Sequence, residues 1–467
     1  MTHKIRPIHL VVSVLVVVYM TTTGIGAAIF PFQFGREQLA AFLYPQPVQL
    51  DWMTSLGSPF YWALLLAMLV VTPITAFVTE RATRRAISNV RLPDIPTWIP
   101  MALAGAMVAF CIYKLARADA LSAYEMWDRS FCYRGRVLRR VELFELLGTR
   151  HYCFAYSSLP ILGCYLLAQG IRQRDTLALL GFAGVSAAIL WFDVAMMMKA
   201  PAVIYIGTLG LTLGLSGFGV VRSALVTASI AVIVYVGLSA LQFCAAETVP
   251  WERTVPCVMN APDPSYVAPP LRVPTSRDAS PSSQPPGDQS QSTIARESGK
   301  PFIYKVLFVV RVVLFRMAAG FPYYVQMFAE PHERCGIELP PMRWLPNQVC
   351  FGPIKVFRRM HPRFEYTVGF QPGPVNASAY GEAGPWYALA AMVACGLILG
   401  TLAALARGYD PLSIAITVAC CIYAYYVAQT SLTGSLIDSY GLLWLMIPLI
   451  LMVTINACCS KLWKTNS

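Results

Sequence analysis

The feature that most constrains this chain is a series of apolar runs, each long enough to cross a membrane. An α-helix rises about 1.5 Å per residue, so roughly 20 apolar residues cross the ~30 Å of hydrocarbon in a bilayer. Such runs cover residues 9–30, 60–78, 97–116, 153–171, 176–197, 201–219, 224–245, 385–406, 411–430 and 441–459. The sequence therefore predicts an all-α, polytopic integral membrane protein with about ten transmembrane helices.

Composition agrees with this class. Of 467 residues, 56% are hydrophobic and 13% are charged, against about 25% charged residues in soluble domains. The net charge of +12 would suggest nucleic acid binding in a soluble protein. In a membrane protein, loop topology and lipid phosphates account for the same excess of cations. We therefore expect membrane lipids as partners and no nucleic acid.

The basic residues predict how the chain is threaded. If the N-terminus is cytoplasmic and the runs alternate, the cations of the inner loops and C-terminal tail are Arg81, Arg84, Arg85, Arg91, Arg172, Arg174, Arg222, Arg407, Lys461 and Lys464. Short, basic inner loops follow the positive-inside rule, so both termini are expected in the cytoplasm. The first run lacks a convincing A-x-A site, so we expect it to remain as an anchor and not to be cleaved as a signal peptide.

Three parts follow from this threading. Residues 1–245 form a seven-helix transmembrane half that includes a basic outer loop, 117–152. Residues 246–384 form a long outer loop, and residues 385–467 form a three-helix C-terminal part.

The long outer loop has two contrasting portions. Residues 262–300 are rich in Pro, Ser, Gln and Gly, and we predict disorder because they have too little apolar surface to bury. Residues 302–383 concentrate the side chains that chemistry needs, so they are the candidate active-site region. We expect this region to contain helices that lie on the membrane surface or re-enter it.

The candidate region opens with residues 302–318, which have helical character and carry three cations, Lys305, Arg311 and Arg316. Lys305 and Arg316 are eleven residues apart, about three helical turns, so they point the same way. Three cations make a spanning helix costly by several kcal/mol. We therefore predict a surface helix with cations facing an anionic ligand. The alternative is that these three cations extend to lipid phosphates or pair with glutamates later in the loop.

The basic outer loop 117–152 has a similar character. Its apolar residues at helical spacing are Val137, Val141, Phe144 and Leu147. A surface helix with Arg136, Arg139 and Arg140 on its other side is therefore expected. These arginines face either a ligand or anionic lipid headgroups.

Cysteine positions predict one disulfide. Cys335 and Cys350 lie fifteen positions apart in the long outer loop, where an oxidising compartment favours a disulfide. In the chain-entropy model such a bridge stabilises by about 3 kcal/mol. Cys132, Cys153 and Cys257 are alternative partners.

Several classes of chemistry lack their motifs. The chain has no G-x-x-x-x-G-K-[ST], G-x-G-x-x-G after a strand, H-E-x-x-H, C-x-x-C or D-x-D, so we expect no metal and no cofactor. Charges inside the apolar runs are few, mainly Asp193, Lys199 and Lys114. A proton-driven transporter needs more polar groups along its path. The pattern therefore favours chemistry at the outer face.

Sugar transfer from a polyprenyl diphosphate fits the residues of the outer loop. It needs cations to neutralise the departing diphosphate and a base for the proton of the acceptor hydroxyl. Arg358 and Arg363 add to the cations of the predicted surface helix, and the base candidates are His361 and Glu382. Glu365 follows His361 by one helical turn and would orient it. A solvated loop histidine is the alternative interpretation of His361.

The order of these features resembles the O-antigen and oligosaccharide repeat-unit polymerase family, from about residue 135 onward. The resemblance lies in LFELLGTRHYCFAYSSLPILGCYLL with the following MMMKAPAVIYIGTLGLTL, in VVLFRMAAGFPYYVQMF and in NASAYGEAGPWYALA. It implies a membrane-embedded glycosyltransferase at the periplasmic face of the bacterial inner membrane. A growing glycan on undecaprenyl diphosphate would move, with inversion and without a metal, onto the next lipid-linked repeat unit.

The resemblance also implies roles for residues of this chain. Arg311 and Arg316 become contacts of the diphosphate or glycan, and Arg358 a second cation. His361 or Glu382 becomes the base. The arginines of the basic outer loop would line the other side of the site. A chain-length regulator is a further expected partner.

Other functions share parts of this pattern. A ligase that moves finished glycan onto a lipid A core uses the same donor and a similar architecture. A flippase for lipid-linked repeat units would need a polar path through the spans. A membrane scaffold for envelope assembly needs no reactive residues.

Overall fold

The computed structural model describes residues 6–42, 53–88, 92–118, 120, 143, 145–196, 198–241, 314–315, 317–339, 350–360, 371–438 and 441–466. All of them belong to one compact unit made of residues 1–243 and 311–467. Its elements up to residue 243 are α1 (Pro7–Tyr19), η1 (Met20–Gly24), α2 (Ile25–Ile29), α3 (Gln33–Phe42), α4 (Pro59–Ala86), α5 (Trp98–Arg117), α8 (Thr149–Cys153), η3 (Phe154–Ser158), α9 (Leu159–Gln173), α10 (Thr176–Ala195), α11 (Lys199–Leu213), η4 (Gly214–Phe218) and α12 (Val220–Leu241).

The second stretch of the unit is also helical. Its elements are α15 (Gly320–Met327), η6 (Pro331–Glu333), α16 (Gly352–Met360), α17 (Val375–Ala383), α18 (Pro385–Leu405), α19 (Pro411–Val427), α20 (Leu432–Leu436) and α21 (Leu442–Asn466). No strand occurs among the described residues, so the all-α prediction is confirmed for this part of the chain.

Within the described residues, eight helical segments are long and apolar enough to cross a membrane. They are Pro7–Ile29, Pro59–Ala86, Trp98–Arg117, Thr149–Gln173, Thr176–Ala195, Ala200–Phe218, Pro385–Leu405 and Leu442–Lys461. Two of the ten predicted spans correspond to shorter apolar helices, Val221–Tyr235 and Pro411–Val427. The protein is therefore a polytopic membrane protein.

Local sequence explains where several helices begin. Ser58, Asp175 and Asp410 accept hydrogen bonds from backbone N–H groups of the first turns of α4, α10 and α19. These N-caps satisfy donors that have no partner within the helix. Pro59 and Pro411 follow two of these caps at the first helical position, where a missing N–H costs nothing.

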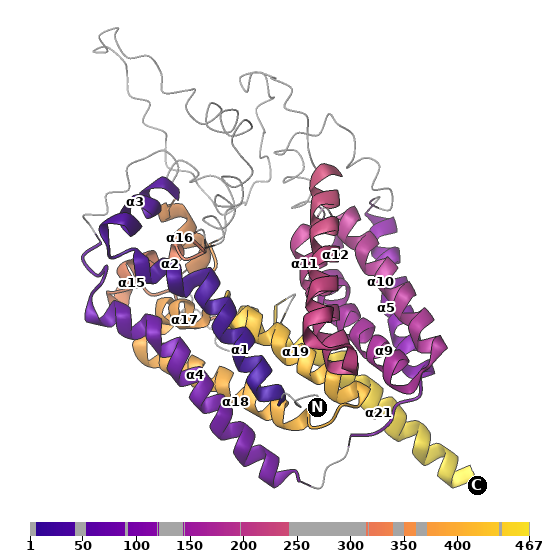
Figure 1. The fold of residues 1–467 in the computed structure, drawn as a ribbon. Coiled ribbons are helices and arrows are strands. Elements are labelled where there is room, and N and C mark those ends of the chain that lie inside the picture. The colour runs from indigo at the N-terminus through magenta and orange to yellow at the C-terminus, as the bar shows by residue number, and fades with distance from the viewer. Residues whose placement is uncertain are drawn as a thin grey trace. The chain divides into compact units, whose positions relative to one another are not determined.

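Helix α19 lies at the centre of the unit. It contacts α1, α9, α11, α18 and α21, and nearly all of its side chains are buried. Its sequence is apolar all round, as expected for a helix with no lipid-facing side. Figure 1 shows α19 between the group of α1, α4 and α18 and the group of α5 and α9 to α12.

Helices α4 and α18 pack closely along most of their length. A Cβ at Gly396 would lie 2.7 Å from the Thr72 carbonyl oxygen, so only glycine allows this approach. The Thr72 hydroxyl donates to the Met392 carbonyl at 3.2 Å. Small residues and hydroxyl groups at helix contacts are typical of packing within membranes.

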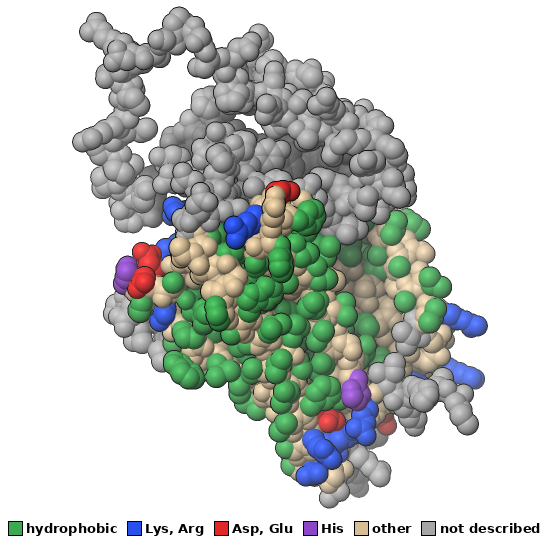
Figure 2. Space-filling view, turned by 60° about the vertical axis from the view of Figure 1, so that its left-hand side comes forward, with side chains coloured by type: hydrophobic (Ala, Val, Ile, Leu, Met, Phe, Trp, Pro, Cys, Tyr) green, Lys and Arg blue, Asp and Glu red, His purple; other side chains and the backbone are tan. Residues whose placement is uncertain are grey.

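The helices have two chemically different ends. One, which we call the basic end, carries Arg6 before α1, Arg84 and Arg85 at the end of α4, and Arg407 after α18. Figure 1 places the start of α1 and the end of α21 toward this end. Figure 2 shows hydrophobic side chains over the middle of one face, with Lys and Arg gathered at its lower edge. This layering is what a membrane-spanning protein needs.

Candidate active site

The opposite end carries a cap, which we define as α15, α16, α17 and residues 331–339. Figure 1 shows these helices near the starts of α4 and α18, and α17 contacts both. Aromatic pairs join the two layers: the rings of Tyr61 and Phe321 are 5.2 Å apart and those of Phe60 and Tyr380 are 5.0 Å apart. The candidate region therefore folds onto the transmembrane helices.

Helix α15 is the buried base of the cap. Six of its eight residues, GFPYYV, are buried. The Tyr324 hydroxyl donates to the Gln371 carbonyl oxygen at 3.2 Å, and Gln326 Oε1 accepts from both the N–H and the hydroxyl of Ser55, at 3.0 and 2.6 Å. These bonds join segments that are distant in sequence.

Several residues of the run NASAYGEAG, residues 376–384, have structural roles in packing and chain direction. Asn376 donates through Nδ2 to the Leu64 carbonyl at 2.8 Å and to the Tyr19 hydroxyl at 3.2 Å, which ties α17 to α4 and α1. A Cβ at Gly381 would lie 2.9 Å from the Phe328 ring. Gly384 has a φ of +92°, a conformation that favours glycine, and it turns the chain into α18.

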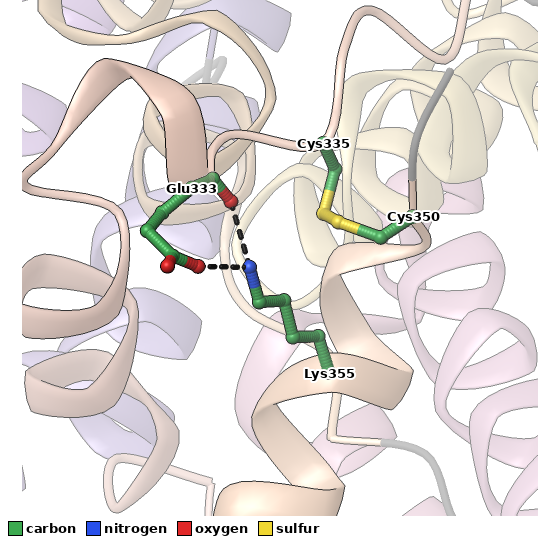
Figure 3. Close-up of a disulfide and its surroundings, with 4 residues drawn as sticks. All are labelled: Glu333, Cys335, Cys350 and Lys355. Carbon is green, nitrogen blue, oxygen red and sulfur yellow. Dashed lines mark hydrogen bonds and ion pairs between the residues drawn. A yellow bond between two sulfur atoms is a disulfide. The ribbon is translucent and has the colours of Figure 1, made fainter.

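A disulfide and an ion pair fasten α16 to the preceding segment (Figure 3). Cys335 and Cys350 are disulfide-bonded, with their Cα atoms 4.6 Å apart. Lys355 Nζ donates to Glu333 Oε2 at 2.6 Å and to the Glu333 carbonyl at 2.9 Å. These bonds lower the pKa of the Glu333 carboxyl. Lys355 is thereby engaged within the protein.

Two buried glutamates meet in the cap. Residues 335–336 donate backbone hydrogen bonds to the carbonyls of Gly381 and Glu382, each at 3.0 Å. This pairing places the Glu338 N–H 3.2 Å from Glu382 Oε2, to which it donates. The two side chains are 4% and 3% exposed, so both carboxyls lie away from solvent.

One oxygen of this pair is unusual. Glu382 Oε1 is buried and makes no hydrogen bond of normal geometry within the described part of the chain, although the Tyr387 hydroxyl lies near the carboxyl. Burial raises the pKa of Glu382 to about 8, and the nearby Glu338 carboxyl adds to the rise. The group is therefore mostly protonated at neutral pH. A raised pKa of this kind is common at functional sites and also occurs in purely structural pairs.

Arg358 is exposed on α16, while Val356 and Met360 on the same helix are buried. No carboxylate pairs with Arg358 among the described residues. Arg334, in contrast, lies against Gly384 and over the Tyr380 ring, 5.9 Å from its centre. The cap therefore presents one unpaired arginine and holds another by packing.

The structure brings only some of the predicted residues together. Arg358, Glu382, Cys335 and Cys350 all belong to the cap. The remaining predicted site residues lie outside the described residues: Lys305, Arg311, Arg316, His361, Arg363, Arg136, Arg139 and Arg140.

Glu338 is the main residue that sequence reasoning missed. It lies in CGIELPP, 44 positions before Glu382, and no local pattern marks it as the neighbour of that residue. The predicted disulfide was the available signal, because it indicated that residues around 335 are held in a fixed place.

No protein-family model, curated protein or solved structure matches the chain.

Proposed function

We propose that this protein is a glycosyltransferase that polymerises lipid-linked oligosaccharide repeat units at the outer face of the bacterial inner membrane. The observation that carries the proposal is the cap, where a buried carboxyl with an unpartnered oxygen and an unpaired exposed arginine share one small helical assembly. The cap stands away from the basic end, and the positive-inside rule puts that end in the cytoplasm.

The proposed step needs one base and several cations. The bond between the anomeric carbon and the diphosphate oxygen breaks, and the acceptor hydroxyl oxygen forms a new bond to that carbon with inversion. Because Glu382 Oε1 is buried, the proposal requires the cap to open when the acceptor binds. The hydroxyl proton then passes to Oε1 of ionised Glu382, while Oε2 keeps its bond from the Glu338 N–H. A pKa of about 8 suits this role, because a base works best when its pKa lies near the operating pH.

Cations would take the charge of the leaving diphosphate. Arg358 supplies a guanidinium on the cap surface, and Arg311 and Arg316 are assigned the same work by the family resemblance. The planar fork of arginine contacts two phosphate oxygens at once. His361 is the alternative base.

The test is polymer formation from purified lipid-linked repeat units by wild-type and variant proteins. Glu382→Gln should abolish polymer, because glutamine still accepts the Glu338 N–H but cannot take a proton. Arg316→Ala should lower the rate about a hundredfold, as expected for losing one stabilising contact to the leaving group. Glu330→Gln, at an exposed position just before the cap, and Lys300→Ala are the controls that should stay active.

The phenotype of a deletion strain separates the related functions. A polymerase leaves one repeat unit per lipid, a ligase leaves lipid A without repeats, and a flippase loses all surface repeats. A normal ladder in the deletion strain would contradict every one of these functions. A normal polymer from Glu382→Gln protein would contradict only the base and would turn attention to His361.

A further inference from the structure

A second site lies far from the cap, at the basic end. A pocket of about 240 Å³ is lined there by Arg6, Arg84, Arg407, Tyr409 and Thr417. Three arginines around one small pocket create a positive potential that an anion would neutralise.

The arginines of this pocket are fixed to different degrees. Arg407 donates through Nε to the Ala404 carbonyl at 3.1 Å and through Nη2 to the Arg84 carbonyl. Arg84 forms an ion pair with Glu80 at 3.3 Å. Arg6 and Arg407 have no carboxylate partner among the described residues. Neither Arg6 nor Arg407 is therefore neutralised by a direct ion pair within the described residues.

A nearby carboxylate, Asp410, forms no ion pair with these arginines in the described structure. The Asp410 carboxylate accepts from the Ser413 N–H at 2.9 Å and from the Ser413 hydroxyl at 2.6 Å, as the N-cap of α19. The Asp410 charge lowers the positive potential of the pocket, but its hydrogen-bonded oxygens are directed to Ser413, so a direct anionic partner for Arg6 and Arg407 would come from outside the described residues.

An apolar groove continues from this pocket. It has a volume of about 350 Å³ and lies between Leu10 of α1 and the helices α11 and α12. Leu215 lines both the groove and the arginine pocket. The groove is bordered mainly by small residues: Gly207, Gly210, Gly214, Ala224, Ala228 and Ala231.

Position and chemistry together define the ligand. The groove lies along helices of the membrane-spanning part, where hydrocarbon chains are the surrounding solvent, and the pocket lies where lipid headgroups reside. A molecule that fits both must carry a phosphate or similar anion at one end and a hydrocarbon chain at the other.

We propose that the pocket and groove bind one anionic phospholipid, with its phosphate among Arg6, Arg84 and Arg407 and an acyl chain along α11 and α12. This site is independent of the proposed glycosyl transfer. It gives the arginines of the basic end a specific ligand in addition to their general role in topology.

The experiment measures lipid binding to the purified full-length protein by native mass spectrometry and by the shift in melting temperature. The probes are phosphatidylglycerol, phosphatidylcholine and inorganic phosphate. Phosphatidylglycerol should bind at least tenfold more tightly than phosphatidylcholine. Arg6→Gln should weaken phosphatidylglycerol binding about fivefold, as expected for one cation near a lipid phosphate. Arg6 is exposed and makes no side-chain hydrogen bond in the described structure, so this variant should fold.

Two matched controls make the test specific. Arg81→Gln removes the same charge from α4 outside the pocket and should leave binding unchanged. Gly207→Leu should fill the groove and weaken lipid binding, because a Cβ at Gly207 meets nothing within 4 Å. Gly184 on α10 has equally open space, and Gly184→Leu should leave lipid binding unchanged. Equal binding of the two lipids, or equal losses in Arg6→Gln and Arg81→Gln, would overturn the proposal. Stabilisation by inorganic phosphate alone, unaffected by Gly207→Leu, would replace the lipid with free phosphate.

Discussion

Two glutamates of the cap show how surroundings set the chemistry of one residue type. Glu333 lies near the surface, and the hydrogen bond from Lys355 lowers the pKa of its carboxyl. Glu382 lies in the interior, where burial, reinforced by Glu338, raises the pKa to about 8. The same side chain is therefore ionised at one place and protonated at the other near neutral pH.

The raised pKa of Glu382 predicts a dependence of stability on pH. Between about pH 4.5 and 8 the folded protein keeps a proton that the unfolded chain has released, so stability falls as pH rises, by at most about 1.4 kcal/mol per pH unit. Glu382→Gln should flatten this slope, because glutamine does not titrate. Melting temperatures of the purified proteins across this range provide the measurement.

A matched variant controls for general charge effects on this slope. Glu333→Gln should leave it unchanged, because the lowered pKa of Glu333 affects stability only at more acidic pH. An identical slope in wild-type and Glu382→Gln protein would show that this carboxyl is not the group responsible.

At the level of elements, α16 depends on its connections. A helix of nine residues is too short to be stable by itself in water. The Cys335–Cys350 disulfide precedes its first turn, the Lys355–Glu333 ion pair holds its middle, and Val356 and Met360 bury its inner side. The position of Arg358 therefore follows from covalent and packing constraints.

Removing the disulfide tests this dependence. The double variant Cys335→Ser/Cys350→Ser should lose about 3 kcal/mol of stability in the chain-entropy model, seen as a lower melting temperature. Transfer activity should fall as well, because α16 carries a proposed diphosphate contact. Cys458→Ser, which removes an exposed free thiol on α21, should change neither. An unchanged melting temperature in the double variant would mean that packing alone holds α16.

For the whole molecule, the distribution of charge predicts orientation in the membrane. The basic end holds Arg6, Arg84 and Arg407 together, and the positive-inside rule places such an end in the cytoplasm. The cap would then face the periplasm, where a disulfide is stable.

Reporter fusions test this orientation. Alkaline phosphatase fused at Ser283 in the long outer loop should be active, whereas fusion after Gly408 should be inactive. A fluorescent protein after the C-terminus should fold in the cytoplasm. The reverse pattern at Ser283 and Gly408 would overturn both the orientation and the proposed outer-face chemistry.

Much of the architecture was predictable from the sequence alone. Apolar length predicted the positions of the spans, because the thickness of the bilayer imposes a minimum on each helix. The helices at Pro7–Ile29 and Pro385–Leu405, for example, match the runs at 9–30 and 385–406. These properties are local, since each depends on a single continuous stretch of chain.

The surroundings of the candidate site were decided only by the tertiary structure. The sequence marks Glu382 as a possible base, but its hydrogen-bond partner and charged neighbour is Glu338, 44 positions away. The pocket at the basic end likewise combines Arg6, Arg84 and Arg407 from three distant stretches. Burial and electrostatic potential are sums over neighbours in space, so no local pattern contains them. The sequence by itself determined which residues could react, and the packing of the helices decided which of them meet.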